Sequence, residues 1–131
     1  GVFRLKSPHT GIKRIWYAGY YSWKGFVATW KGEAAFRQEV VLFILMLPLA
    51  FWLGETAFQR ALLISVLLIV LIVELLNSSI ETVVDRIGED YHPLSGRAKD
   101  QGSAAVFLSF LVAFLVWGSF IISKAMSYWG G

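Results

Sequence analysis

The sequence predicts an all-α membrane protein with three membrane-spanning helices and an amphipathic surface helix near its N-terminus. Hydrophobic residues make up 56% of the 131-residue chain, above the about 45–50% that is usual in soluble domains. Six Trp, five Tyr and ten Phe give an aromatic content that is typical of membrane interfaces. The chain is long enough for one small domain, and its lack of cysteine excludes disulfides and thiol chemistry.

The first predicted element is a helix over residues 12–31, which is too polar to cross a membrane. Its apolar stripe covers about 80° of arc at about 100° per residue. Lys13, Lys24 and Lys31 flank the stripe, where long side chains can reach lipid phosphates. We therefore expect this helix to lie on the membrane surface, with a helix packed on protein in the cytosol as the alternative. The stripe consists of Trp16, Tyr20, Trp23, Val27 and Trp30.

Three predicted membrane-spanning helices follow, over about residues 33–53, 57–87 and 96–123. The last includes residues 104–123, which hold no charge, and about 20 such residues cross a bilayer. A helix over 57–87 is roughly 45 Å long, more than the roughly 30 Å hydrocarbon core, so its charged end should emerge into water. Pro48 in the first span is compatible with a membrane helix.

The positions of Lys and Arg predict the orientation. Three spans place the N-terminal region and the polar loop 88–102 on one side, which then holds nine of the twelve Lys and Arg residues. By the positive-inside rule this side faces the cytoplasm. The nine are Arg4, Lys6, Lys13, Arg14, Lys24, Lys31, Arg86, Arg97 and Lys99.

A polar stripe on the second span is the strongest functional signal. Its members fall within about 100° of arc on one helix face. A carboxylate at the bilayer centre costs on the order of 2.5–3.5 kcal/mol, so such residues usually face a partner or a functional site. A polar seam between helices is the alternative, but Ser or Asn would form it at lower cost. The stripe consists of Glu74, Asn77, Ser78, Glu81 and Asp85.

Depth in the membrane suggests a different chemistry for each acid. Glu74 comes first in the emerging helix, and burial makes a carboxylate a stronger proton acceptor near neutral pH. Glu81 lies roughly 10 Å nearer the cytoplasm, at a level that Glu33 can share. Two carboxylates open to water suit a Mg²⁺ that arrives with nucleotide phosphates. Asn77 could orient either acid or a substrate hydroxyl, so we expect a reaction between a lipid and a water-borne partner.

The loop 88–102 is the candidate site for that partner, although a charged loop is usually only a solvated loop. Ser95 could cap a helix that begins at Gly96, whose N-terminal amides would favour anions. The chain has neither a P-loop nor a Gly-rich kinase signature, so no standard nucleotide fold is present. The polar residues near the loop are Arg86, His92, Arg97, Lys99 and Asp100.

Three sequence blocks resemble the prokaryotic diacylglycerol kinase family, in the family's order and spacing. They are AGYYSWKG (18–25), EAAFRQE (33–39) and VELLNSSIETVVDRIGEDYHPLSGRAKDQGSAA (73–105), and the resemblance covers about residues 12–123. It implies transfer of the γ-phosphate of MgATP to the hydroxyl of diacylglycerol, giving phosphatidic acid. It also implies a homotrimer with shared active sites in the bacterial cytoplasmic (inner) membrane, with the N-terminus in the cytoplasm and no nucleic-acid partner.

The resemblance further implies residue roles. Glu74 would be the general base, with Asn77 as a catalytic neighbour and Asp85 in support, and Glu33 and Glu81 would hold Mg²⁺. The expected nucleotide and cofactor contacts are Tyr21, Glu33, Glu81, Asp90, Tyr91, His92, Lys99 and Asp100. The expected lipid-substrate contacts are Arg14, Ala18, Tyr21, Ser22, Trp23, Ala35, Gln38, Glu39, Glu74 and Ser103.

Two other functions fit the same pattern. An undecaprenol kinase of the same fold would use a polyprenol, but blocks 18–25 and 33–39 look more like the diacylglycerol-using members. A small oligomeric channel or transporter would line a cation path with the carboxylates and would need no ATP.

Overall fold

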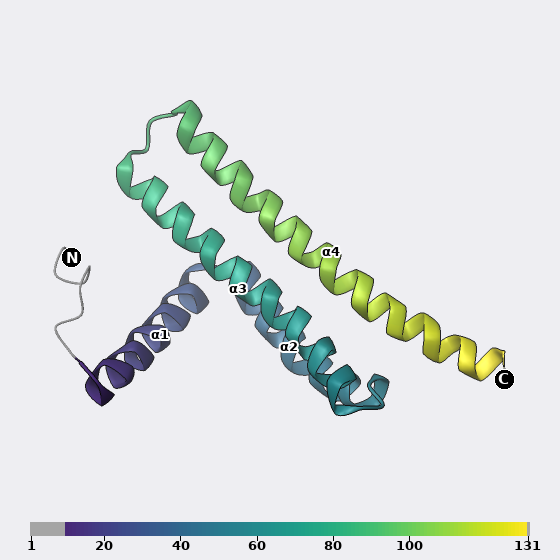
Figure 1. The fold of residues 1–131 in the computed structure, drawn as a ribbon. Coiled ribbons are helices and arrows are strands. Elements are labelled where there is room, and N and C mark those ends of the chain that lie inside the picture. The colour runs from purple at the N-terminus through teal and green to yellow at the C-terminus, as the bar shows by residue number, and fades with distance from the viewer. Residues whose placement is uncertain (1–9, 131) are drawn as a thin grey trace. The chain divides into compact units, whose positions relative to one another are not determined.

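A computed structural model of the chain describes residues 10–130, most of which are helical. The four helices are α1 (Ile12–Gly32), α2 (Ala34–Leu53), α3 (Ala57–Ile87) and α4 (Pro93–Trp129) (Figure 1). α2, α3 and α4 are each long and apolar enough to cross a membrane. The prediction of an all-α protein with three spans and an additional N-terminal helix is therefore confirmed. Arg4 and Lys6, which entered the predicted charge distribution, lie outside the described residues.

The chain divides into two compact units, of which the first extends to Ala34 and contains α1. α1 ends because Glu33 adopts an extended backbone conformation, while its N–H still donates to the Thr29 carbonyl at 2.9 Å. Large aromatic side chains of the predicted stripe are exposed on this helix, including Trp16, Trp23 and Trp30. α1 thus presents the apolar side chains that a surface helix needs.

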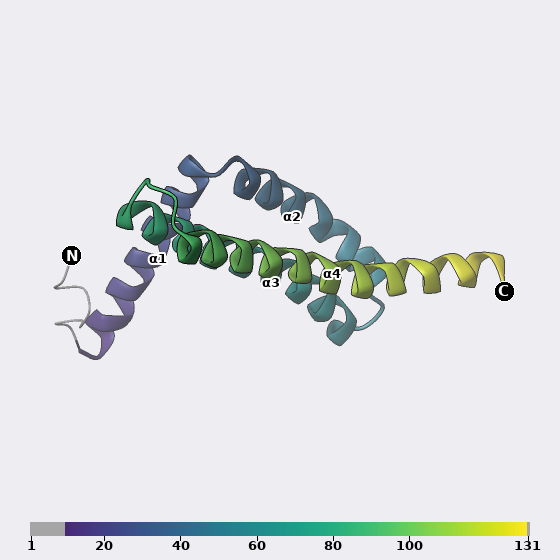
Figure 2. The same cartoon turned by 90° about the horizontal axis from the view of Figure 1, so that it is seen from above.

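The second unit, from Ala35 onward, contains α2, α3 and α4. α3 and α4 run side by side in opposite directions (Figure 1), and α4 lies over α3 in the view of Figure 2. Their shared core is extended by Ala50 and Leu53 from α2. The Trp117 indole N–H donates to the Leu63 carbonyl at 3.1 Å in the buried interior, which ties α4 to α3. Small residues such as Ala50 and Ala113 let neighbouring membrane helices approach closely.

The link between α3 and α4 differs from the expected one. α4 begins at Pro93 rather than at Gly96, and its N-cap is His92 rather than Ser95. His92 Nδ1 accepts a hydrogen bond from Leu94 N at 3.1 Å, and Pro93 needs no partner for a missing N–H. The link therefore consists of residues 88–92 only. Ser95 and Lys99 lie within α4 and not in the link. We call this link, with the adjoining ends of α3 and α4, the loop end.

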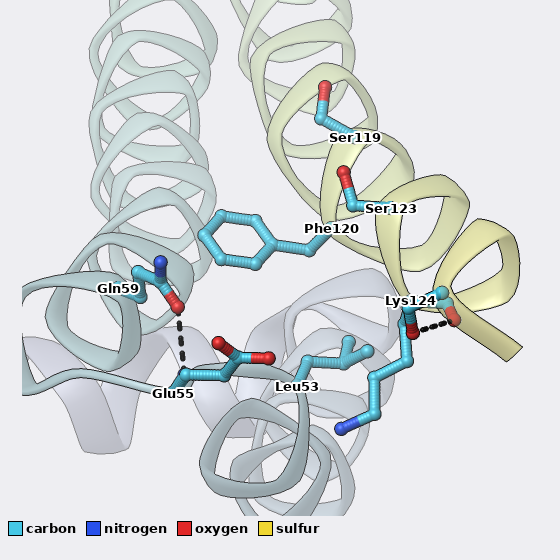
Figure 3. A pocket seen from close by; sticks show the side chains of 8 residues that line it. Leu53, Glu55, Gln59, Ser119, Phe120, Ser123 and Lys124 are labelled. Atoms are coloured by element: carbon cyan, nitrogen blue, oxygen red, sulfur yellow. Dashed lines mark hydrogen bonds between the residues drawn. The ribbon is translucent and has the colours of Figure 1, made fainter. Parts of the chain in front are cut away.

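The opposite end of the unit, which we call the turn end, is the Gly54–Thr56 link with the C-terminal part of α4. The Thr56 hydroxyl accepts from Gln59 N at 3.1 Å, and Gln59 Oε1 accepts from Glu55 N at 2.8 Å. This pair is a reciprocal helix cap. A cavity of about 340 Å³ lies here (Figure 3), lined by Leu53, Glu55, Gln59, Ser119, Phe120, Ser123, Lys124 and Ser127.

Two cationic side chains at the turn end donate hydrogen bonds to main-chain carbonyls at the end of α2. Arg60 Nε donates to the carbonyls of Phe51 at 3.3 Å and Gly54 at 3.1 Å. From α4, Lys124 Nζ donates to the Trp52 carbonyl at 3.0 Å and lies 4.2 Å from the centre of the Trp52 ring. Positive charge at the C-terminus of α2 stabilises the negative end of that helix.

Candidate active site at the loop end

The polar stripe on α3 contacts both α2 and α4. Glu74 interacts with Glu39 of α2, whereas Asp85 forms an ion pair with Lys99 of α4. Glu74, Asn77 and Glu81 are half-buried, and Asp85 is exposed. This order of burial agrees with a helix that leaves the membrane toward its C-terminus.

The deepest contact of the stripe is a pair of carboxyl groups. The side chains of Glu39 on α2 and Glu74 on α3 are near neighbours and interact electrostatically. Glu39 Oε2 is buried and has no hydrogen-bond partner among the described residues. The pair therefore combines two acidic side chains with a buried acceptor oxygen that is available to another group.

An apolar cavity of about 310 Å³ adjoins this pair, between α2, α3 and α4. Among residues 10–130, Glu39 is the only charged residue that lines it. The other lining residues are Leu42, Phe43, Met46, Leu67, Val70, Leu71, Phe110, Ala113, Phe114 and Trp117. An apolar cavity with one polar group matches the form of a site for an amphiphile, whose hydrocarbon part it can cover.

One turn nearer the loop end, Asn77 and Glu81 are linked. Asn77 Nδ2 donates to Glu81 Oε1 at 3.3 Å. Asn77 Oδ1 is buried and has no hydrogen-bond partner within residues 10–130. On the α4 side, Asn77 abuts Gly102. Of the two acids that Asn77 could orient, the one to which it donates a hydrogen bond is Glu81.

At the loop end itself, Lys99 Nζ of α4 and Asp85 Oδ1 of α3 form an ion pair at 2.9 Å. The pair borders a cavity of about 480 Å³. Four of the expected nucleotide contacts line it together with Asp85: Asp90, Tyr91, His92 and Lys99. Tyr91 also lines a neighbouring cavity of about 620 Å³ with Arg97 and Asp100. The structure thus gathers these expected contacts around one region.

The other expected site residues lie on α1, α2 and α4. Arg14, Ala18, Tyr21, Ser22 and Trp23 lie on α1, where the Ser22 hydroxyl donates to the Ala18 carbonyl at 2.8 Å. Ala35, Gln38 and Ser103 are exposed near the starts of the apolar parts of α2 and α4.

The expected metal pair falls on both units, Glu33 on the first and Glu81 on the second. No group of three or more Asp, Glu or His residues within residues 10–130 is arranged to hold a metal ion. The donor chemistry nevertheless fits Mg²⁺, which binds through one or two carboxylates and completes its shell with water and substrate phosphates. Glu81 offers a carboxylate of this kind, and Asn77 Nδ2 donates a hydrogen bond to one of its oxygens.

The fold and the site together define a class: an α-helical membrane protein with a carboxyl pair beside an apolar cavity and a second cavity, lined by charged residues, at the loop end. Comparison with known proteins narrows this class. The model of the family described as prokaryotic diacylglycerol kinase matches residues 20–121. The chain belongs to this family, and the prediction that it is a kinase is confirmed.

Relatives named diacylglycerol kinase cover most of the chain. The relative from Escherichia coli K12 is 57% identical over 108 residues, which are 82% of this chain and 88% of that protein. The relative from Pseudomonas aeruginosa is 50% identical over 113 residues, or 86% of this chain and 92% of that protein. A relative from Helicobacter pylori is 37% identical over 121 residues, or 92% and 94% of the two chains.

Proposed function

We propose that this protein transfers the γ-phosphate of ATP to the free hydroxyl of diacylglycerol, giving phosphatidic acid and ADP. The observation that supports this most directly is the Glu39–Glu74 carboxyl pair beside the apolar cavity. A lipid whose acyl chain occupies that cavity would have its polar end at the carboxyl groups. Membership of a family whose relatives are named for this activity supports the same substrate.

In this proposal Glu74 accepts the proton of the lipid hydroxyl with Glu39 beside it, and Asn77 supports the reaction by orienting Glu81. The hydroxyl oxygen attacks the γ-phosphorus, the bond from that phosphorus to the β–γ bridging oxygen breaks, and ADP leaves. Negative charge develops on the phosphate oxygens during this transfer, and nearby cations stabilise it. Lys99 lines the loop-end cavity beside Asp85 and can supply such a positive charge.

Glu33 and Glu81 are the proposed ligands of a Mg²⁺ ion, which would neutralise charge on the nucleotide phosphates. Asp90, Tyr91, His92 and Asp100 are the proposed further contacts of ATP. On α1, Tyr21 and its neighbours are the proposed contacts at the lipid side. They are Arg14, Ala18, Ser22 and Trp23, joined from the second unit by Ala35, Gln38 and Ser103.

The proposed location is the bacterial cytoplasmic membrane, with the N-terminus and the loop end in the cytoplasm. The excess of Lys and Arg on that side supports this orientation. We further propose a homotrimer with active sites shared between chains, as the family resemblance implies. Large apolar side chains exposed on α2–α4, such as Phe51, Ile72 and Phe107, are available to lipid or to a second copy.

The proposal is tested by supplying purified protein in mixed micelles with labelled ATP, Mg²⁺ and either diacylglycerol or undecaprenol. We expect labelled phosphatidic acid to form faster than undecaprenyl phosphate. Faster labelling of undecaprenol would assign the protein to the polyprenol-using branch. Ion flux in vesicles without any ATP consumption would instead support a channel and contradict kinase function.

The cavity itself can be tested by filling it. Leu71→Trp adds volume at a lining residue of the apolar cavity and should raise the KM for long-chain diacylglycerol several-fold. Leu68→Trp is the matched control, because Leu68 is on the same helix but is exposed and outside the lining set. Equal effects of the two variants would argue against an acyl chain in this cavity.

A further inference from the structure

Gly102 marks the closest approach of α4 to the polar stripe of α3. A Cβ atom at Gly102 would overlap Asn77 Oδ1 and lie 3.2 Å from Asn77 Cγ. Gly102 is itself buried, so the space around it is enclosed by protein. While the Asn77 amide keeps its present position, only a glycine fits at this point of α4.

The two sides of the Asn77 amide have different partners. Its Nδ2 donates to Glu81 Oε1 at 3.3 Å, whereas its buried Oδ1 points to Gly102 and has no hydrogen-bond partner within the described chain. The reverse orientation would set the amide oxygen against a carboxylate oxygen, and both can only accept. A weak contact of Oδ1 with the Cα–H of glycine is available in the present orientation. The orientation of the Asn77 amide is therefore fixed by its hydrogen bond to Glu81 on one side and by its close contact with Gly102 on the other.

We propose that Gly102 is a positioning residue, which leaves room for the Asn77 amide and through it aims the Glu81 carboxylate. The glycine sets the spacing of α3 and α4 at the level of the proposed metal ligand. This inference deepens the proposed function and rests on it, because the consequence for catalysis depends on Glu81 binding Mg²⁺. Nothing in the sequence pattern marked Gly102 as a member of the site.

The first test is the Gly102→Ala variant, assayed for phosphatidic acid formation over a range of free Mg²⁺. The added methyl group displaces the Asn77 amide, and Glu81 loses its N–H donor. A hydrogen bond to a charged group has a large enough effect that the Mg²⁺ concentration for half-maximal rate should rise about tenfold or more. The KM for diacylglycerol should stay within about twofold of the parent. Gly118→Ala is the matched control on α4, since a Cβ at Gly118 meets nothing within 4 Å.

A double variant separates positioning from simple packing. In Asn77→Ala the side chain that obstructs the methyl group is absent, so adding Gly102→Ala should change the Mg²⁺ requirement by less than about twofold. Independent, multiplying effects of the two substitutions would overturn the proposal, as would an equal rise in the KM values for Mg²⁺ and lipid. If Gly102→Ala alone does not fold, the double variant can still be measured, because it has room for the methyl group. Its Mg²⁺ requirement is then compared with that of Asn77→Ala, and the same outcomes support or overturn the proposal.

The side-chain amide signal of Asn77 in a ¹⁵N-labelled sample provides a readout that needs no activity. We expect Glu81→Gln and Gly102→Ala to shift this signal, and Gly118→Ala to leave it in place. An Asn77 signal that is unmoved in Gly102→Ala overturns the inference. Absence of phosphatidic acid from the parent protein would instead refute the proposed function, and the amide signal would still decide the role of Gly102.

Discussion

The loop end and the turn end of the second unit both place charged side chains near the ends of helices, but the contacts of these side chains differ. At the turn end, Arg60 and Lys124 donate to main-chain carbonyls at the end of α2. Along the stripe, side chains bind other side chains, and Glu39 Oε2 and Asn77 Oδ1 keep buried oxygens without a hydrogen-bond partner among residues 10–130. Buried polar atoms are normally satisfied, so unsatisfied ones in a charged cluster indicate a site for a ligand rather than a structural joint. Substitutions matched between the two ends test this difference.

The largest expected effect follows from Glu74→Gln. The amide keeps the shape of the side chain and can still contact Glu39, but it cannot accept the proton of the lipid hydroxyl. We expect kcat to fall by about 10²–10⁴-fold, as is usual for loss of a general base, while ATP binding persists. Steady-state assays and nucleotide binding to the purified variant measure both quantities.

Glu55→Gln is the matched control at the turn end, where Glu55 is exposed. Its rate should stay within about twofold of the parent. A Glu74→Gln variant that turns over at a near-parental rate would rule out Glu74 as the base.

A smaller effect, on metal dependence, is expected from Glu81→Gln. Loss of one carboxylate should raise the Mg²⁺ concentration for half-maximal rate about tenfold and weaken nucleotide affinity with it. Titration of the rate with Mg²⁺ at fixed ATP measures the change. Coinciding titrations of the variant and the parent would show that Glu81 is not a metal ligand.

The same substitution at two lysines compares the ends directly. Lys99→Met removes the ammonium that pairs with Asp85 at the loop-end cavity, so the KM for ATP should rise roughly tenfold. Lys124→Met removes a bond to the Trp52 carbonyl, so the KM for ATP should not change. Its expected effect is a loss of about 0.5–1.5 kcal/mol of stability, the usual contribution of one hydrogen bond. A higher KM for ATP in Lys124→Met would break the distinction between the ends.

The smallest expected effect on activity comes from Gly54→Ala. A Cβ there would lie 2.6 Å from Arg60 Cγ and 2.9 Å from Arg60 N, so the α2–α3 link must shift. Overpacking of this kind costs about 1–3 kcal/mol, which thermal unfolding in detergent micelles can detect. The KM values for ATP and lipid should equal those of Gly118→Ala. An unchanged unfolding temperature would contradict the tight packing at Gly54.

Much of the fold followed from local sequence patterns. The span over 57–87 could be predicted because length and apolar composition act along one helix, and the shared face of Glu74 and Glu81 follows from the helical period alone. The start of α4 at Pro93 differed because the His92 cap and Pro93 together outweighed the Ser95–Gly96 signal.

The partners of the stripe could not be predicted from pattern. The Glu39–Glu74 and Asn77–Gly102 contacts join residues far apart in the sequence. Their formation depends on how close α2 and α4 come to α3, which no local period encodes. The Glu33–Glu81 metal pair stays a prediction.

The most direct test of the central claim is ³¹P NMR of the purified protein with MgATP and diacylglycerol, followed in time for the parent and for Glu74→Gln. The parent should produce phosphatidic acid and ADP in equal amounts as ATP disappears, and Glu74→Gln should produce neither at a comparable rate. ADP without phosphatidic acid, or matching phosphatidic acid signals from both proteins, would contradict a lipid kinase with Glu74 as its base.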